Sequence, residues 1–131
     1  MIVVDTHIII WDALKPEMLS KNAKNAIKKA NKNDGIIISD ISLWEIAMLI
    51  KKNRLEINVP HLEFMELVKS SNNYIIQSIN PEIADISVNL SSEINADPAD
   101  RIICATSIFK DIPLITADKN LLKSSLVKTI W

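Results

Sequence analysis

Residues 35–50 read Gly-Ile-Ile-Ile-Ser-Asp-Ile-Ser-Leu-Trp-Glu-Ile-Ala-Met-Leu-Ile, and this stretch decides the fold class. Its first part, Ile36 to Ile38, is a short β-branched run typical of a buried strand. Its second part, Ile41 to Ile50, is polar only at Ser42 and Glu45 and is interpreted as a helix buried on nearly all sides. The stretch therefore predicts a strand that leads into a helix, the repeating unit of α/β folds.

The same alternation extends over the rest of the chain. Further buried strands are predicted at Ile2–Val4, Tyr74–Ile76 and Leu114–Ile115, with Val127–Trp131 as a weaker edge strand. Helical apolar stripes lie between them, at Ala23, Ala26, Ile27 and Ala30, at Ile83, Ile86, Leu90 and Ile94, and at Ile102, Ile103, Thr106 and Phe109. The second stripe begins with Asn80 as N-cap and Pro81 at the first helical position. We expect an α/β chain with a three-layer α/β/α fold around a central parallel sheet, in one domain of residues 1–131.

Composition excludes several classes of protein. Hydrophobic residues make up 48% and the net charge is −1, as in an ordinary soluble globular protein and unlike one that coats DNA. A single glycine, Gly35, rules out the glycine-rich loops that bind nucleotides. The one cysteine, Cys104, is interpreted as a buried packing residue in a reducing cytoplasm. No signal peptide or membrane span is visible, so we expect a cytoplasmic protein without a membrane partner.

Acidic residues stand where strands turn into helices. Asp5 follows the first strand, Glu45 lies in the helix after the second, Asp97 and Asp100 flank the start of a third helix, and Asp118 follows the strand near Leu114. Right-handed crossovers place every such turn at the same edge of a parallel sheet, where ligands bind. Carboxylates without cationic partners form a hard-oxygen site that suits Mg²⁺ or Mn²⁺. Such a site usually carries out phosphoryl chemistry.

Each acid also has a structural interpretation as a helix cap. Asp5, Asp97 and Asp118 stand at N-cap positions, Asp100 falls in a first turn, and Ser42 with Glu45 matches a capping box. Glu45 fits this alternative least well, because a carboxylate in an apolar helix needs a partner. The joint pattern favours a shared site.

The motifs resemble those of a known family. They are Asp5-Thr6 after the first strand, Ser42-Leu43-Trp44-Glu45 in the next helix, Asp97-Pro98-Ala99-Asp100-Arg101, and Leu114-Ile115-Thr116 followed by Asp118. In this order they resemble PIN-domain ribonucleases, and in particular the VapC-type toxins of type II toxin–antitoxin modules. The resemblance covers the chain from Ile2 to Trp131.

The resemblance implies a PIN-like nuclease domain and a metal-dependent endoribonuclease that hydrolyses RNA phosphodiester bonds. Asp5, Glu45, Asp100 and Asp118 match the family's acidic quartet, and Asp97 and Thr116 match accessory positions. Asp5 and Asp100 are the expected direct ligands of Mg²⁺ or Mn²⁺, with Glu45 and Asp118 bound directly or through water. The ion would activate a water and stabilise the leaving oxygen.

The resemblance also implies a cognate antitoxin that covers the site. An apolar groove for it is expected near the Trp44 helix and the following segment, at Ile57, Val59, Leu62, Phe64 and Met65. The same apolar surplus predicts a two-fold homodimer. Two alternatives remain open: a receiver-like phosphoacceptor domain, which also places acids at strand ends, and a non-catalytic module whose acids cap helices or only bind metal.

Overall fold

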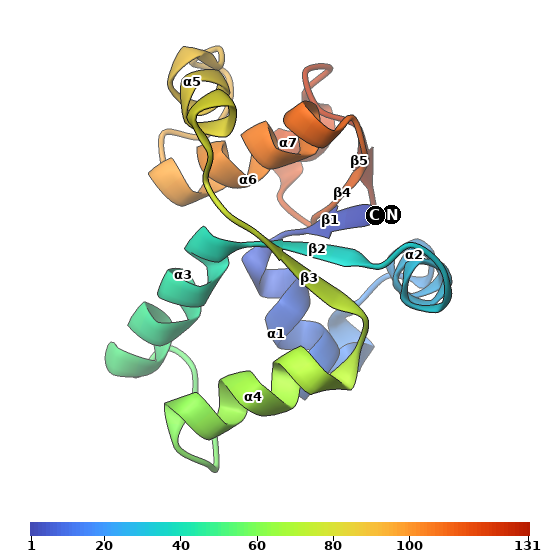
Figure 1. The fold of residues 1–131 in the computed structure, drawn as a ribbon, viewed down its shortest axis with the longest axis vertical. Helices are drawn as coiled ribbons and strands as arrows, with labels where there is room; N and C mark the ends of the chain where they lie inside the picture. Colours follow the sequence, from blue (N-terminus) through green and yellow to red (C-terminus); the bar gives the residue numbers. More distant parts are fainter.

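A computed structural model describes all residues, 1–131, and contains a five-stranded sheet flanked by helices (Figure 1). The strands are β1 (Ile2–Val4), β2 (Ile36–Ser39), β3 (Tyr74–Gln77), β4 (Leu114–Ile115) and β5 (Thr129–Ile130). The helices are α1 (Thr6–Leu14), α2 (Lys21–Lys32), α3 (Asp40–Lys51), α4 (His61–Ser71), α5 (Pro81–Asn89), α6 (Pro98–Lys110) and α7 (Lys119–Lys123), with a 3₁₀ turn at Pro16–Met18.

The sheet has the order β3-β2-β1-β4-β5, and every neighbouring pair is parallel. Val3 pairs with Ile37 on one side and with Leu114 on the other, so β1 is the central strand. The chain adds β2 and β3 on one side of β1, and β4 and β5 on the other. The direction of winding therefore switches between β1 and β4, and ligands of open parallel sheets bind outside the strand ends at such a point.

Two hydrophobic cores cover the two faces of the sheet and confirm the predicted three layers. One core gathers Ile8 and Ile9 of α1, Ala23 and Ile27 of α2, and Phe64 of α4 against the sheet. The other places Ile103 and Cys104 of α6 and Leu121 of α7 against Val3, Ile37 and Leu114. Each fully buried Ile or Leu side chain contributes about 1.5–3 kcal/mol relative to an exposed one. The buried Cys104 packs as predicted.

The turn before β2 explains the single glycine. Gly35 has φ +103, a conformation that side chains with a Cβ rarely adopt, and its amide donates to the Ala30 carbonyl at the end of α2. A Cβ there would lie 2.8 Å from Ile75 Cδ1 of β3. Glycine therefore lets the chain leave α2 and enter the sheet close to the edge strand.

Two predictions of burial and one of helix length were wrong. The run Tyr74–Ile76 forms an edge strand, and Ile75 and Ile76 remain 40% and 39% exposed. In α3 only Ser42 and Ile46 are buried, and Trp44 is 58% exposed, because the helix lies at the end of the sheet. The stripe that begins with Ile83 ends early: α5 stops at Asn89, and Ile94 joins the core from the following loop.

The third stripe also differs from the prediction at one end, since Phe109 of α6 is 41% exposed while Ile103 and Thr106 are buried.

None of the helices has the length and apolar character needed to cross a membrane.

Candidate active site

A hollow of about 410 Å³ lies at the carboxyl ends of β1 and β4, at the switch point of the sheet. The structure brings together in its wall every acid that the sequence singled out, namely Asp5, Glu45, Asp97, Asp100 and Asp118. His7, Trp11 and Ala117 complete the lining, so no lysine or arginine takes part. We refer to this hollow as the acid pocket.

Asp5 is the most buried of these acids, with 8% of its surface exposed. Its Oδ1 accepts the Thr6 amide at 2.8 Å, and its Oδ2 accepts the Thr116 hydroxyl at 2.8 Å. Thr116 Oγ1 in turn accepts the Asp118 amide at 3.1 Å. Thr116 thus ties the end of β4 to the end of β1, and both oxygens of Asp5 are held in fixed directions.

Glu45 does not form the capping box of the structural alternative. The N-cap of α3 is Ser39, whose hydroxyl accepts the Ile41 amide, so Ser42 lies inside the helix. The hydroxyl of Thr6 instead donates to Glu45 Oε1 at 2.5 Å and lies 2.9 Å from Ser42 Oγ. This contact from α1 fixes the Glu45 carboxylate beside Asp5.

The cap interpretation holds for the acids that precede helices. Asp5, Asp97 and Asp118 are the N-caps of α1, α6 and α7, and each carboxylate accepts at least one backbone amide. Asp100 accepts no backbone amide. Capping and membership of the acid pocket are therefore compatible at three positions, and Glu45 and Asp100 have no capping role.

Asn95, in the loop before α6, links two of the acids. Its Nδ2 donates to Asp100 Oδ2 at 3.0 Å and to Asp118 Oδ2 at 2.8 Å, and its Oδ1 accepts from Asn120 Nδ2. Arg101 holds this loop in place, because its guanidinium donates to the carbonyls of Ser87 and Leu90, and it forms no ion pair with the acids. One uncharged amide therefore offsets the repulsion between two carboxylates.

Neither Asn95 nor the role of Thr6 is predicted by the sequence. Asn95 stands two residues before Asp97, but an amide in a polar loop carries no distinctive signal. Thr6 stands out in the sequence only as part of the motif Asp5-Thr6. Its contact with Glu45 joins residues 39 positions apart and depends on how α1 and α3 pack.

Burial and mutual repulsion raise the pKa of three acids. Burial is the main cause for Asp5, Glu45 and Asp100, and it raises the pKa of Asp100 to about 6. Neighbouring carboxylates add to the effect: Asp118 acts on Asp5, and Asp5 acts on Glu45 and Asp100. Hydrogen bonds from Thr116 and Asn95 work in the opposite direction. The pocket therefore holds more negative charge than its surroundings neutralise.

The chemistry of this pocket fits a hard divalent cation. Its donors are carboxylate oxygens, which Mg²⁺ and Mn²⁺ prefer, and a cation would relieve the repulsion that raises these pKa values. In this structure no group of three or more His, Cys, Asp or Glu side chains is placed so that it could hold a metal ion. The hydrogen bonds of Asn95 and Thr6 occupy one oxygen each of Asp100, Asp118 and Glu45.

Comparison with known proteins agrees with this geometry. The family model of the PIN domain matches residues 2–124. Ribonuclease VapC22 from Mycobacterium tuberculosis (strain ATCC 25618 / H37Rv) is 32% identical over 120 residues, which cover 92% of this chain and 88% of that protein.

Solved structures share the fold. The crystal structure of VapBC2 from Rickettsia felis bound to a DNA fragment from their promoter matches with a TM-score of 0.75 at 18% identity, over 98% of this chain and 97% of that chain. The structure of FitAcB from Neisseria gonorrhoeae matches with a TM-score of 0.65 at 19% identity, over 98% and 96%.

The chain therefore belongs to the PIN domain family, and its resemblance to the VapC-type members of that family is confirmed. The receiver-like alternative is not favoured, since the strand order β3-β2-β1-β4-β5 differs from the order 2-1-3-4-5 of flavodoxin-like folds.

The raised pKa of Asp100 predicts how stability depends on pH. Without divalent cations, Asp100→Asn should stabilise the protein at pH 7 by about 1 kcal/mol, because the variant lacks a charge that burial disfavours; solvent screening keeps the effect small at this partly exposed site. The pKa of Asp100 is 3.8 in the unfolded chain and about 6 in the folded protein. Between these pH values the folded state binds one proton more at Asp100 than the unfolded state, so the wild type gains stability as the pH falls through this range.

Chemical denaturation in EDTA at pH 7 and at about pH 4 measures this difference, which should shrink at the lower pH. Asp85→Asn, at an exposed acid on α5, is the control and should change little. A variant less stable than the wild type at pH 7 would contradict the prediction.

Proposed function

We propose that this protein is a metal-dependent endoribonuclease toxin of the VapC type, which hydrolyses RNA phosphodiester bonds and is silenced by a cognate antitoxin. The main support is an acid pocket without cations at the switch point of a PIN-domain sheet. The identity to Ribonuclease VapC22, which spans 92% of the chain, supports RNA as the substrate.

The acids receive distinct roles in this proposal. Asp5 and Asp100 are the direct ligands of Mg²⁺ or Mn²⁺, and Glu45 and Asp118 complete the shell directly or through water. Asp5 suits its role because Thr6 and Thr116 hold both its oxygens in fixed directions. Mg²⁺ commonly keeps several waters, so four carboxylates need not all touch the ion.

The accessory residues keep the acids in place. Thr116 orients Asp5, and Asp97 caps α6 and so sets the position of Asp100 one turn later. Asn95 keeps Asp100 and Asp118 close together before an ion binds. When bound, the ion supplies charge stabilisation at the phosphate and lowers the pKa of a coordinated water.

Substitution of the acids tests the catalytic assignment. Asp5→Asn and Asp100→Asn should abolish RNA cleavage in Mg²⁺ or Mn²⁺ while the protein stays folded, because each removes a ligand charge and keeps the shape of the side chain. Glu45→Gln should reduce cleavage severely, with a small change in melting temperature. Cleavage of RNA and the rise in melting temperature on adding Mn²⁺ are the two measurements.

Asp111→Asn is the matched control, since the Asp111 side chain forms only an exposed ion pair with Lys128 and does not line the acid pocket. It should keep full activity and the full response to Mn²⁺. Undiminished cleavage by Asp5→Asn or Asp100→Asn would contradict the assignment, and retained activity of Glu45→Gln would leave Glu45 a structural role.

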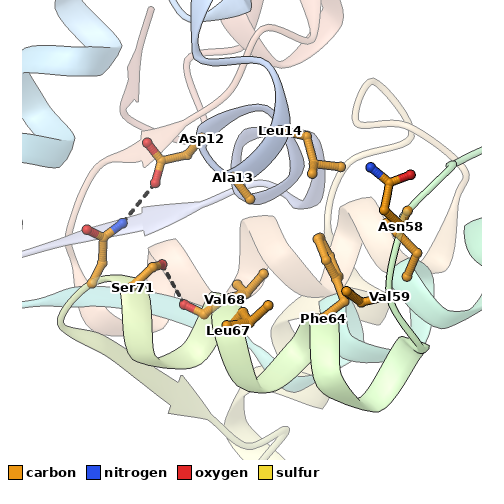
Figure 2. Close-up of a pocket in the computed structure, with 11 residues that line it drawn as sticks. Asp12, Ala13, Leu14, Asn58, Val59, Phe64, Leu67, Val68 and Ser71 are labelled. Carbon is orange, nitrogen blue, oxygen red and sulfur yellow. Dashed lines mark hydrogen bonds between the residues drawn. The ribbon is translucent and has the colours of Figure 1, made fainter.

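The antitoxin requires an apolar surface, and the structure has one on α1 and α4. A groove of about 520 Å³ lies between α1, the segment 57–59 and α4, and seven of its eleven lining residues are hydrophobic. Figure 2 shows Leu14, Val59, Phe64 and Leu67 around it. An amphipathic antitoxin segment could place its apolar side chains there.

The position of this groove corrects part of the sequence analysis. Ile57, Val59 and Phe64 line it as expected. Leu62 and Trp44 do not, and Met65 is buried in the core under α4. This groove therefore lies between α1 and α4, and no residue of α3 lines it.

Leu67→Glu should weaken binding of the co-expressed antitoxin at least tenfold, because a buried charge in an apolar contact costs several times the 1.4 kcal/mol that a tenfold change requires. Calorimetric titration of the purified proteins measures the effect. Val88→Glu is the control: Val88 is 75% exposed on α5, outside the groove, whereas Leu67 is 57% exposed within it. An equal loss of antitoxin affinity in Leu67→Glu and Val88→Glu would show that the antitoxin does not bind in this groove.

The expected homodimer remains a prediction. Twelve large hydrophobic side chains are exposed, among them Trp44 at 58% and Leu62 at 76%, and exposed apolar side chains of this kind support association of two chains. Light scattering of the isolated protein should give about twice the chain mass. A mass of one chain at every concentration tested would contradict this.

A further inference from the structure

A second hollow adjoins the acid pocket. It has a volume of about 660 Å³ and lies where α1 faces the end of α3 and the segment that follows it. His7 and Trp11 line both hollows, so the two lie side by side at these side chains. We refer to the second hollow as the trough.

The trough differs from the acid pocket in charge. Lys15 and Arg54 line it, both are exposed, and neither forms an ion pair with any carboxylate of the chain. Glu56 is the one acid in its wall, so the trough carries a small positive charge. Asn53 and Asn58 add amide donors.

Trp11 stands at the junction of the two hollows. Its ring is tilted by 58° against His7 and by 51° against Trp131, with centroids 6.0 Å apart in both pairs. It is partly exposed, so tilted aromatic neighbours support the indole while part of it borders the open space. An indole supported in this way is a platform on which a base can stack.

We propose that the trough binds the single-stranded RNA next to the phosphodiester bond that is cleaved in the acid pocket, with one base on Trp11 and adjacent phosphates at Lys15 and Arg54. This inference rests on the proposed function. The acids alone would repel RNA, and the unpaired cations of the adjoining trough supply attraction along the strand. A duplex keeps its bases stacked inside, so a base reaches Trp11 only from a single strand.

Arg54→Gln and Lys15→Gln test the phosphate contacts. Binding of a fluorescein-labelled single-stranded RNA of about ten nucleotides is measured by anisotropy in EDTA, which prevents cleavage, at several salt concentrations. Each variant should bind more weakly, and the slope of log affinity against log salt should become shallower by about 0.7. Lys28→Gln, at an exposed lysine of α2 outside the trough, should leave the slope unchanged.

Trp11→Leu tests the stacking contact. Affinity should fall about tenfold while the salt slope stays the same, because stacking involves no counterion release. Trp44→Leu is the control, since Trp44 is exposed and outside the trough. A melting curve checks that Trp11→Leu is folded; if it is not, the test rests on Arg54→Gln and Lys15→Gln, which are surface changes.

Several outcomes would overturn the proposal. One is a salt dependence of binding that stays unchanged in both Arg54→Gln and Lys15→Gln. Another is an equal loss of affinity in a folded Trp11→Leu and in Trp44→Leu. The third is duplex RNA that binds as tightly as single-stranded RNA and loses the same affinity in these variants. Loss of antitoxin binding without loss of RNA binding would make the trough a protein-binding surface. If the wild type binds RNA as expected but does not cleave it in Mg²⁺ or Mn²⁺, the proposed function fails while this binding result stands.

Discussion

The hydrogen bond from the Thr116 hydroxyl to Asp5 Oδ2, 2.8 Å long, joins the two strands between which the sheet changes its direction of winding. Asp5 is 8% exposed, so its carboxylate depends on this donor and on the Thr6 amide. The bond forms only if β4 lies beside β1, and the acids from α3 and α6 then meet the same pocket. The arrangement of the site thus follows from the order of the strands.

The acid pocket holds several carboxylates close together and partly buried, where burial and mutual repulsion both disfavour their charged form. Capping at Asp97 and Asp118, the Asn95 amide and the Thr6 hydroxyl each offset part of that cost. The structure therefore reconciles the two interpretations that the sequence left open, since an acid can cap a helix and still present an oxygen to the pocket. A pocket that remains short of positive charge is suited to a divalent cation.

Much of the fold was predictable because the signals are local. The β-branched runs, the caps at Asn80 and Asp97, and the alternation of strands and helices depend on neighbouring residues, and the structure confirms them. Burial was predicted less well. Ile75 and Ile76 look like a buried strand in sequence, and their exposure follows from the place of β3 at the sheet edge. Local apolar character cannot distinguish an edge strand from a central one.

By itself the sequence determined the α/β class, the parallel sheet and the set of acids that gather at one edge, because a strand followed by a helix fixes the direction of each crossover. Only the tertiary structure decided which side chains hold these acids. Asn95 meets Asp118 across 23 residues, and Thr6 meets Glu45 across 39. It also decided that the trough and the acid pocket meet at His7 and Trp11. Contacts of this kind depend on how separate elements pack, and periodicity along a chain carries no record of that packing.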